Sequence, residues 1–174
     1  MLVPLAAVPV AAAVAWMWPI VVPREERRRW QQRSTGRFLF EFTLRLIVTT
    51  VVLEEVAFRG LLFGAARIAW EGFWCPALLS ASLFGLWHIS PTLTDARLTG
   101  RAVAMRKVAG TVITTIGFGL ALAGLRNATD SLWPPIALHY AVNASGMAAV
   151  FVSSRRFPAD RQDCAKAQSP RRKA

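Results

Sequence analysis

The sequence has few of the residues that usually build disulfide frameworks, metal sites and nucleophilic active sites. Of its 174 residues only two are cysteines, Cys75 and Cys164, and only two are histidines. Two isolated cysteines provide neither a disulfide framework nor a metal-binding spacing. A Gly-x-Ser-x-Gly motif is missing, which disfavours a serine nucleophile. A His-Glu-x-x-His motif and a glycine-rich phosphate loop are missing as well.

Acidic side chains are also scarce, with 10 Asp and Glu against 21 Lys and Arg, so the formal net charge is +11. Such an excess by itself would fit nucleic-acid binding. The basic residues instead gather between apolar runs, as they do at the cytoplasmic ends of membrane helices. Since 54% of the residues are hydrophobic and only 18% charged, we expect an integral membrane protein in a lipid bilayer and no nucleic-acid partner.

The apolar runs predict an all-α fold, a polytopic transmembrane helical bundle of about five spans. The expected spans are residues 1–22, 38–69, 73–89, 108–125 and 132–152. We expect Ser90-Pro91 to end the third span, because proline disfavours helix at the preceding residue. A loop over residues 92–107 should follow.

This pattern divides the chain into three parts. Residues 1–37 form an N-terminal transmembrane helix and a basic cytoplasmic segment, residues 38–153 form the core, and residues 154–174 form a basic, disordered cytoplasmic tail. The segments 23–37, 92–107 and 153–174 carry 17 of the 21 Lys and Arg residues and lie on one side if each run crosses once. The positive-inside rule then predicts a cytoplasmic C-terminus, in what we expect to be a bacterial plasma membrane.

The second span carries a charged motif, Glu54-Glu55-Val56-Ala57-Phe58-Arg59. On a helix, residues four apart share a face, so Glu55 and Arg59 can form an ion pair. Glu54 has Phe58 as its neighbour four residues on, which cannot neutralise a carboxylate. Charges within a membrane span are functional candidates, and Glu54 is the carboxylate left over for chemistry. The alternative is an architectural charge cluster that holds helices together.

Both histidines also fall in or at the ends of predicted spans. His88 shares a helix face with Phe84, and His139 shares one with Asn143. Intramembrane polar groups face the bundle interior, so these residues can meet the glutamates there. Such a set suits peptide hydrolysis by an activated water, with an imidazole and an amide as oxyanion donors. It also suits a zinc ion with water in the fourth position.

Three motifs in this order resemble those of the CPBP family, the CAAX-processing and bacteriocin-processing intramembrane endopeptidases, also called the Abi family. The motifs are Glu54-Glu55-x-x-x-Arg59, Phe84-x-x-x-His88 and His139-x-x-x-Asn143. The resemblance covers residues 38–152. It implies a membrane endopeptidase with a catalytic core of about four helices and a membrane-associated peptide or protein as its substrate.

The resemblance also implies a role for each residue. Glu54 would be the base and His88 its partner on the water, while His139 and Asn143 would form the oxyanion hole. The supporting residues would be Glu55, Arg59 and Phe84.

Two further interpretations stay open. The expected mechanism needs no cofactor, but a zinc-dependent metalloendopeptidase would use Glu54, His88 and His139 as ligands. A non-catalytic membrane scaffold or a bacteriocin-immunity-type protein could keep the same fold and bind a partner instead. Intact motifs favour the enzyme, because a scaffold could lose Glu54 or His88 without penalty.

Overall fold

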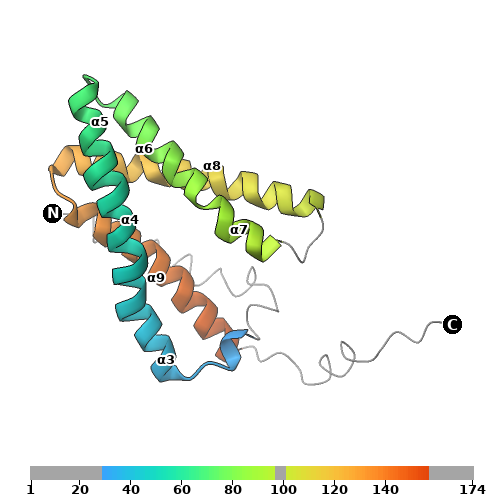
Figure 1. Ribbon diagram of the computed structural model, residues 1–174. Helices are drawn as coiled ribbons and strands as arrows, with labels where there is room; N and C mark the ends of the chain where they lie inside the picture. The colour runs from blue at the N-terminus through green and yellow to red at the C-terminus, as the bar shows by residue number, and fades with distance from the viewer. Residues whose placement is uncertain (1–28, 97–100, 157–174) are drawn as a thin grey trace. The chain divides into compact units, whose positions relative to one another are not determined.

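The computed structural model describes residues 29–96 and 101–156, and these residues form helices and no strand (Figure 1). The predicted all-α fold is therefore confirmed. The predicted span 1–22 and residues 157–174 of the predicted tail lie outside the described residues. The described chain forms two compact units, each treated by itself below. One is Val48–Tyr140, and the other contains residues 29–47 and 141–156.

The helix predicted over residues 38–69 is present as an uninterrupted run of five elements. They are α3 (Thr35–Phe40), the π-helical η2 (Glu41–Val52), α4 (Leu53–Glu55), the π-helical η3 (Val56–Leu62) and α5 (Phe63–Ala69). Ser34 caps the start, because its hydroxyl oxygen accepts from the Arg37 backbone N–H at 3.2 Å. The chain leaves the helix at Trp70 in an extended conformation, and Gly72 at φ +84° makes the turn that follows.

The predicted end of the third span is wrong in detail. Helix α6 (Trp74–Trp87) ends before Ser90-Pro91, and α7 (Ile89–Ala96) then runs through the residues where a loop was expected. Pro91 lies in the first turn of α7, where a backbone N–H has no acceptor within the helix and proline is tolerated. The break is at His88, whose carbonyl oxygen accepts from the Thr92 hydroxyl at 2.7 Å. Residue His88 therefore joins two helices instead of preceding a loop.

The last two helices are longer than their apolar runs suggested. Helix α8 (Arg101–Thr129) extends past its predicted span at both ends, and helix α9 (Trp133–Arg156) extends past its predicted span at the C-terminal end. Pro134 and Pro135 lie in the first turn of α9. Among the described residues, two helical segments are long and apolar enough to cross a membrane: Met105–Thr129 and Trp133–Arg156.

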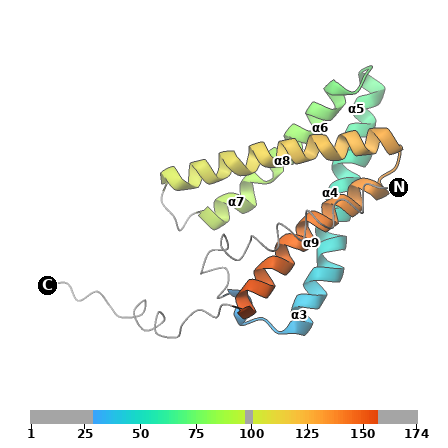
Figure 2. The ribbon, with the colours of Figure 1, turned by 180° about the vertical axis from the view of Figure 1, so that it is seen from behind.

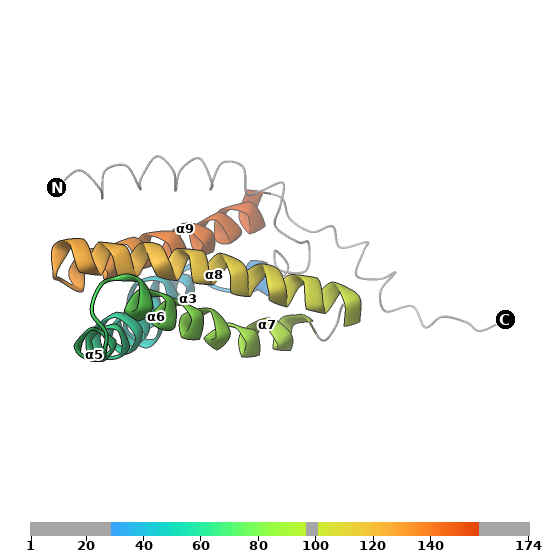
Figure 3. The same ribbon diagram turned by 90° about the horizontal axis from the view of Figure 1, so that it is seen from above.

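The unit Val48–Tyr140 is built on close contact between α6 and α8, which run side by side (Figures 1 and 3). Small buried residues of both helices, among them Ala81 and Gly119, line the contact. A Cβ atom on Gly85 would collide with Cγ1 of Ile116 and lie 3.0 Å from the Val112 carbonyl oxygen. Glycine at this position allows the two backbones to approach, as small residues do between membrane helices.

The other unit joins α3 to the C-terminal part of α9 (Figure 2). The ring of Phe38 stacks on that of Phe151, with centroids 4.0 Å apart. The Gln31 side-chain amide donates to the Ser154 carbonyl oxygen at 3.1 Å. These contacts hold the two segments together, so the basic residues of both segments lie at the same end of this unit.

Many large apolar side chains of the described helices are exposed, whereas the charged residues Glu54, Glu55 and Arg59 are buried. Leu53 is 59% exposed and Ile113 is 72% exposed, whereas Glu55 and Arg59 are both 0% exposed. A water-soluble domain buries its large apolar residues and exposes its charges. The reversed arrangement is that of a protein surrounded by lipid, with its polar groups turned to the interior.

Candidate active site

Glu54 and Glu55 form the short helix α4 between the two π-helical stretches, and both side chains are buried. Glu55 pairs with Arg59, one turn further on, across 3.0 Å between Oε1 and Nη1. Both side chains of this ion pair are completely buried. The pairing predicted from the four-residue spacing is therefore confirmed.

Arg59 is held by two neighbouring helices as well as by Glu55. Its Nη2 donates to the Gly119 carbonyl oxygen of α8 at 3.2 Å. Its guanidinium carbon lies 4.2 Å from the centre of the Phe84 ring of α6, a cation–π distance. A Cβ atom on Gly119 would lie 3.1 Å from Nη2, so the absence of a side chain there leaves room for the guanidinium.

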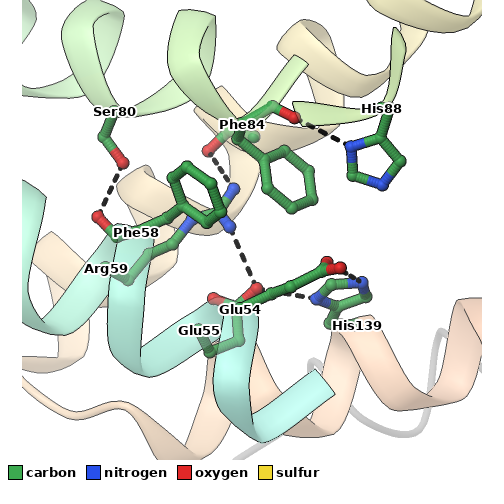
Figure 4. A network of polar contacts seen from close by, with 9 residues as sticks. Glu54, Glu55, Phe58, Arg59, Ser80, Phe84, His88 and His139 are labelled. Atoms are coloured by element: carbon green, nitrogen blue, oxygen red, sulfur yellow. Dashed lines mark hydrogen bonds and ion pairs between the residues drawn. The ribbon is translucent and has the colours of Figure 1, made fainter. Parts of the chain in front are cut away.

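His139 of α9 completes the cluster from a position 84 residues away from Glu55 in the sequence (Figure 4). Its Nδ1 lies 2.7 Å from Oε1 of Glu55. Glu55, as the ionised partner of Arg59, accepts this hydrogen bond, so Nδ1 carries the proton. The other ring nitrogen, Nε2, then lies 3.8 Å from Oε2 of Glu54.

Aromatic rings fix the orientation of the His139 imidazole. Phe84 and Phe118 contact it edge to face, with ring centroids 5.8 Å and 5.6 Å away. Their apolar surface surrounds the imidazole, which is 2% exposed. The hydrogen bond to Glu55 and these two rings hold the imidazole in an orientation that directs Nε2 towards Glu54.

Three members of the cluster have a buried polar atom without a hydrogen-bond partner among the described residues: Glu54 at Oε2, Glu55 at Oε2 and Arg59 at Nε. The Glu54 side chain is almost completely buried. The separation of 3.8 Å between its Oε2 and Nε2 of His139 is too long for a direct hydrogen bond. Polar groups separated by such a distance are often bridged by a water molecule.

His88 lies beside this cluster, at the end of α6. Its Nδ1 is 2.8 Å from the Phe84 carbonyl oxygen, and its ring contacts the Phe84 ring at 4.7 Å. Since a carbonyl only accepts, Nδ1 carries the proton and the neutral ring has its lone pair on Nε2. Phe84 therefore contacts both histidines, but no hydrogen bond or ion pair joins His88 to Glu54 within the described part of the chain.

Asn143 lies on α9 one turn beyond His139, but it belongs to the other compact unit. Its role in an oxyanion hole therefore remains a prediction. The roles assigned to Glu54, His88 and His139 by resemblance also remain predictions, although the structure brings Glu54 and His139 together.

Sequence reasoning missed two residues that hold the cluster. One is Gly119, whose carbonyl oxygen accepts a hydrogen bond from Arg59. The other is Ser80, whose buried hydroxyl donates to the Phe58 carbonyl oxygen at 2.7 Å and ties α6 to η3. The two serines within the apolar run of α6, Ser80 and Ser82, are the signal that could have found it.

The three residues of the zinc alternative, Glu54, His88 and His139, are not all in polar contact with one another. Glu54 and His139 face each other, but His88 uses its Nδ1 on a backbone carbonyl and makes no polar contact with either of them. Within residues 29–96 and 101–156, no three His, Cys, Asp or Glu side chains are arranged so that they could hold a metal ion. A catalytic zinc site usually takes three protein ligands.

Fold and site together define an all-α membrane protein that encloses a buried cluster of two carboxylates, an arginine and a histidine. Residues 36–145, well over half of the chain, match the family described as Type II CAAX prenyl endopeptidase Rce1-like. The chain belongs to this family of CAAX-type membrane endopeptidases, which confirms the resemblance drawn from the three motifs. Neither a curated protein nor a solved structure matches the chain.

Proposed function

We propose that the protein is an intramembrane endopeptidase that hydrolyses a peptide bond of a membrane-associated substrate with a water activated by Glu54. The observation that carries this proposal is the buried, unpartnered Oε2 of Glu54, which faces Nε2 of His139 across 3.8 Å. A carboxylate without a partner is costly in an apolar interior, and a water between these two atoms would satisfy it.

The charges of the cluster support acid–base chemistry. Two carboxylates face one guanidinium that is always ionised, so the cluster carries one excess negative charge unless it holds a further proton. Burying an unbalanced charge is unfavourable. One proton held by the Glu54–His139 pair makes the cluster neutral, which gives this pair a proton to exchange with a substrate.

In the proposed reaction Glu54 takes a proton from the water while the water oxygen attacks the carbonyl carbon of the peptide bond. The C–N bond then breaks, and the proton passes from Glu54 to the leaving amine, so that an acid and an amine are released. His88 can hold the same water through the lone pair on its Nε2, the role that the family resemblance assigns to it.

His139 and Asn143 would donate hydrogen bonds to the oxyanion, again as the resemblance implies. Because Nδ1–H of His139 points at Glu55, the ring can donate from Nε2 only as an imidazolium. The two adjacent carboxylates balance that charge. This makes the pairing of Glu55 with His139 part of the proposed mechanism.

The proposed setting is a bacterial plasma membrane with the C-terminus in the cytoplasm. The support for it is the concentration of basic residues in segments that alternate with apolar helices.

The experiment that tests the function compares wild-type protein with Glu54→Gln. Glutamine keeps the shape of the side chain but cannot act as a base, so cleavage should fall by about 10²–10⁴-fold or more while the protein stays folded. Uncut substrates should accumulate in membranes that contain the variant, which proteomics can detect. Glu71→Gln changes an exposed carboxylate and is the matched control. Equal cleavage by wild type and Glu54→Gln would refute the proposal.

A further inference from the structure

The unit that contains residues 29–47 and 141–156 has a strongly basic end, where α3 begins and α9 ends (Figures 1 and 2). Arg33 lies just before α3, Arg37 lies in its first turn, and Arg155 lies at the end of α9. The Arg155 guanidinium donates to the Arg33 carbonyl oxygen at 2.9 Å, which joins the two segments directly. We call these three arginines the basic cluster.

The basic cluster has many more hydrogen-bond donors than its own acidic partner can use. Glu41 is buried and binds Arg33 and Arg37, the latter at 3.1 Å, while Arg45 lies 3.9 Å away. A carboxylate accepts about four hydrogen bonds, whereas each guanidinium has five N–H donors. The Arg37 side chain remains 66% exposed, so its remaining donors face outward.

Aromatic rings lie against two arginines of this cluster, a combination typical of the region where a membrane meets water. The Arg33 guanidinium carbon lies 4.7 Å from the centre of the Trp30 ring, and that of Arg155 lies 5.2 Å from the centre of the Phe151 ring. Tryptophan and arginine gather at the level of lipid head groups, where an apolar ring and a charged group can each find a suitable environment.

Exposed apolar side chains begin immediately next to the basic cluster on the same unit. Leu39 is 52% exposed, and Phe40 and Leu44 are each 56% exposed. A ligand that covers both surfaces needs an anionic group joined to a long apolar chain. A phospholipid has this composition, whereas a free anion would satisfy the arginines alone.

We propose that Arg33, Arg37 and Arg155 bind the phosphate of an anionic phospholipid whose acyl chains cover the adjacent apolar face of α3 and η2. Guanidinium groups bind phosphate oxygens through paired hydrogen bonds, which suits this role better than an amine would. An anionic head group is favoured because the cluster remains positive after Glu41 is counted. This proposal does not depend on the proposed proteolysis.

The test measures thermal unfolding of the purified full chain in detergent with added phosphatidylglycerol, phosphatidylcholine or inorganic phosphate. A ligand that binds the folded state raises Tm, and we expect phosphatidylglycerol to raise it by at least about 3 °C. The other two additives should raise it far less. An equal shift with phosphatidylcholine would contradict the choice of an anionic head group. An equal shift with inorganic phosphate would contradict a lipid.

The double variant Arg37→Gln with Arg155→Gln should lose the phosphatidylglycerol shift. The matched control Arg67→Gln with Arg126→Gln removes the same charge from the other unit and should keep the shift. Should the double variant fail to fold, each single variant is measured instead, and each should show a reduced shift and fewer bound phosphatidylglycerol molecules by native mass spectrometry. A full shift in both single variants would overturn the proposal.

Discussion

Glu55 uses a single oxygen atom, Oε1, to bind both Arg59 at 3.0 Å and His139 at 2.7 Å. The residue predicted only to neutralise an arginine therefore also orients a histidine from a distant part of the chain. The hydrogen bond to Nδ1 leaves Nε2 for Glu54, so the two adjacent glutamates act on the same imidazole from opposite sides. The two glutamates have different roles, and substitution should separate them.

The first prediction concerns Glu55. Glu55→Gln leaves Arg59 charged and unpaired in the interior, and breaking such a buried pair costs about 3–5 kcal/mol. Adding Arg59→Met removes the lone charge and should recover part of the stability. The double variant should nevertheless cleave poorly, because His139 still lacks its anionic partner. Thermal stability in detergent and activity per folded molecule, measured together, would show this. Full recovery of both stability and activity in the double variant would mean that Glu55 acts only as the ion-pair partner of Arg59.

The second prediction concerns Gly119. A Cβ atom there would lie 3.1 Å from Nη2 of Arg59 and 3.2 Å from Cα of Ala81, so Gly119→Ala must displace the arginine or the helices. Such overpacking costs about 1–3 kcal/mol, and activity per folded molecule should also fall. Gly117 lies in the same helix, and no atom lies within 4 Å of a Cβ added there. Gly117→Ala should therefore leave both stability and activity per folded molecule unchanged. Equal effects of the two substitutions would show that helix propensity, and not contact with Arg59, controls the outcome.

The third prediction concerns metal. Since no three His, Cys, Asp or Glu side chains of the described residues are arranged so that they could hold a metal ion, purified protein should contain no stoichiometric zinc and should keep its activity in chelator. Elemental analysis and an activity assay before and after chelation measure this. Zinc at one ion per chain, lost together with activity, would restore the metalloendopeptidase interpretation.

The fourth prediction concerns Ser80. Its hydroxyl donates to the Phe58 carbonyl oxygen, one residue before Arg59, so it holds η3 against α6. Ser80→Ala should lower stability by about 1 kcal/mol, the typical value of one such hydrogen bond. Ser80→Thr keeps the hydroxyl and is the comparison. Thermal unfolding of the two variants distinguishes loss of the hydrogen bond from a change in packing. If the hydrogen bond matters, Ser80→Ala should lose more stability than Ser80→Thr.

The fifth prediction concerns topology. Basic segments that alternate with apolar helices predict a cytoplasmic C-terminus. A reporter that works only in the cytoplasm should be active when fused after Ala174. Labelling of an engineered cysteine in the tail by a reagent that cannot cross the membrane would contradict this orientation.

Local sequence patterns predicted the features that depend on nearby residues. The helix through the glutamates ends at Ala69, as expected, and the four-residue spacing identified the partner of Glu55. These features follow from hydrophobic runs and helix geometry, which a sequence displays directly.

Contacts between distant segments were not readable in the same way. His139 was expected in the bundle interior, but no spacing rule connects it to Glu55 across 84 residues. The π-helical stretches on both sides of α4 have no signature in the apolar pattern. A loop was expected where α7 forms, because proline disfavours helix at the residue before it. Proline is tolerated in the first turn of a helix, and Pro91 lies in the first turn of α7.

The close approach of α6 and α8 has a consequence for how a substrate can reach Glu54. With Gly85 against Ile116 and Val112, the two backbones lie too near each other to slide or rotate independently. We therefore expect the two helices to move together, and we expect a peptide to enter between other elements. Spin labels placed on the two helices should keep the same separation before and after a candidate peptide substrate is added.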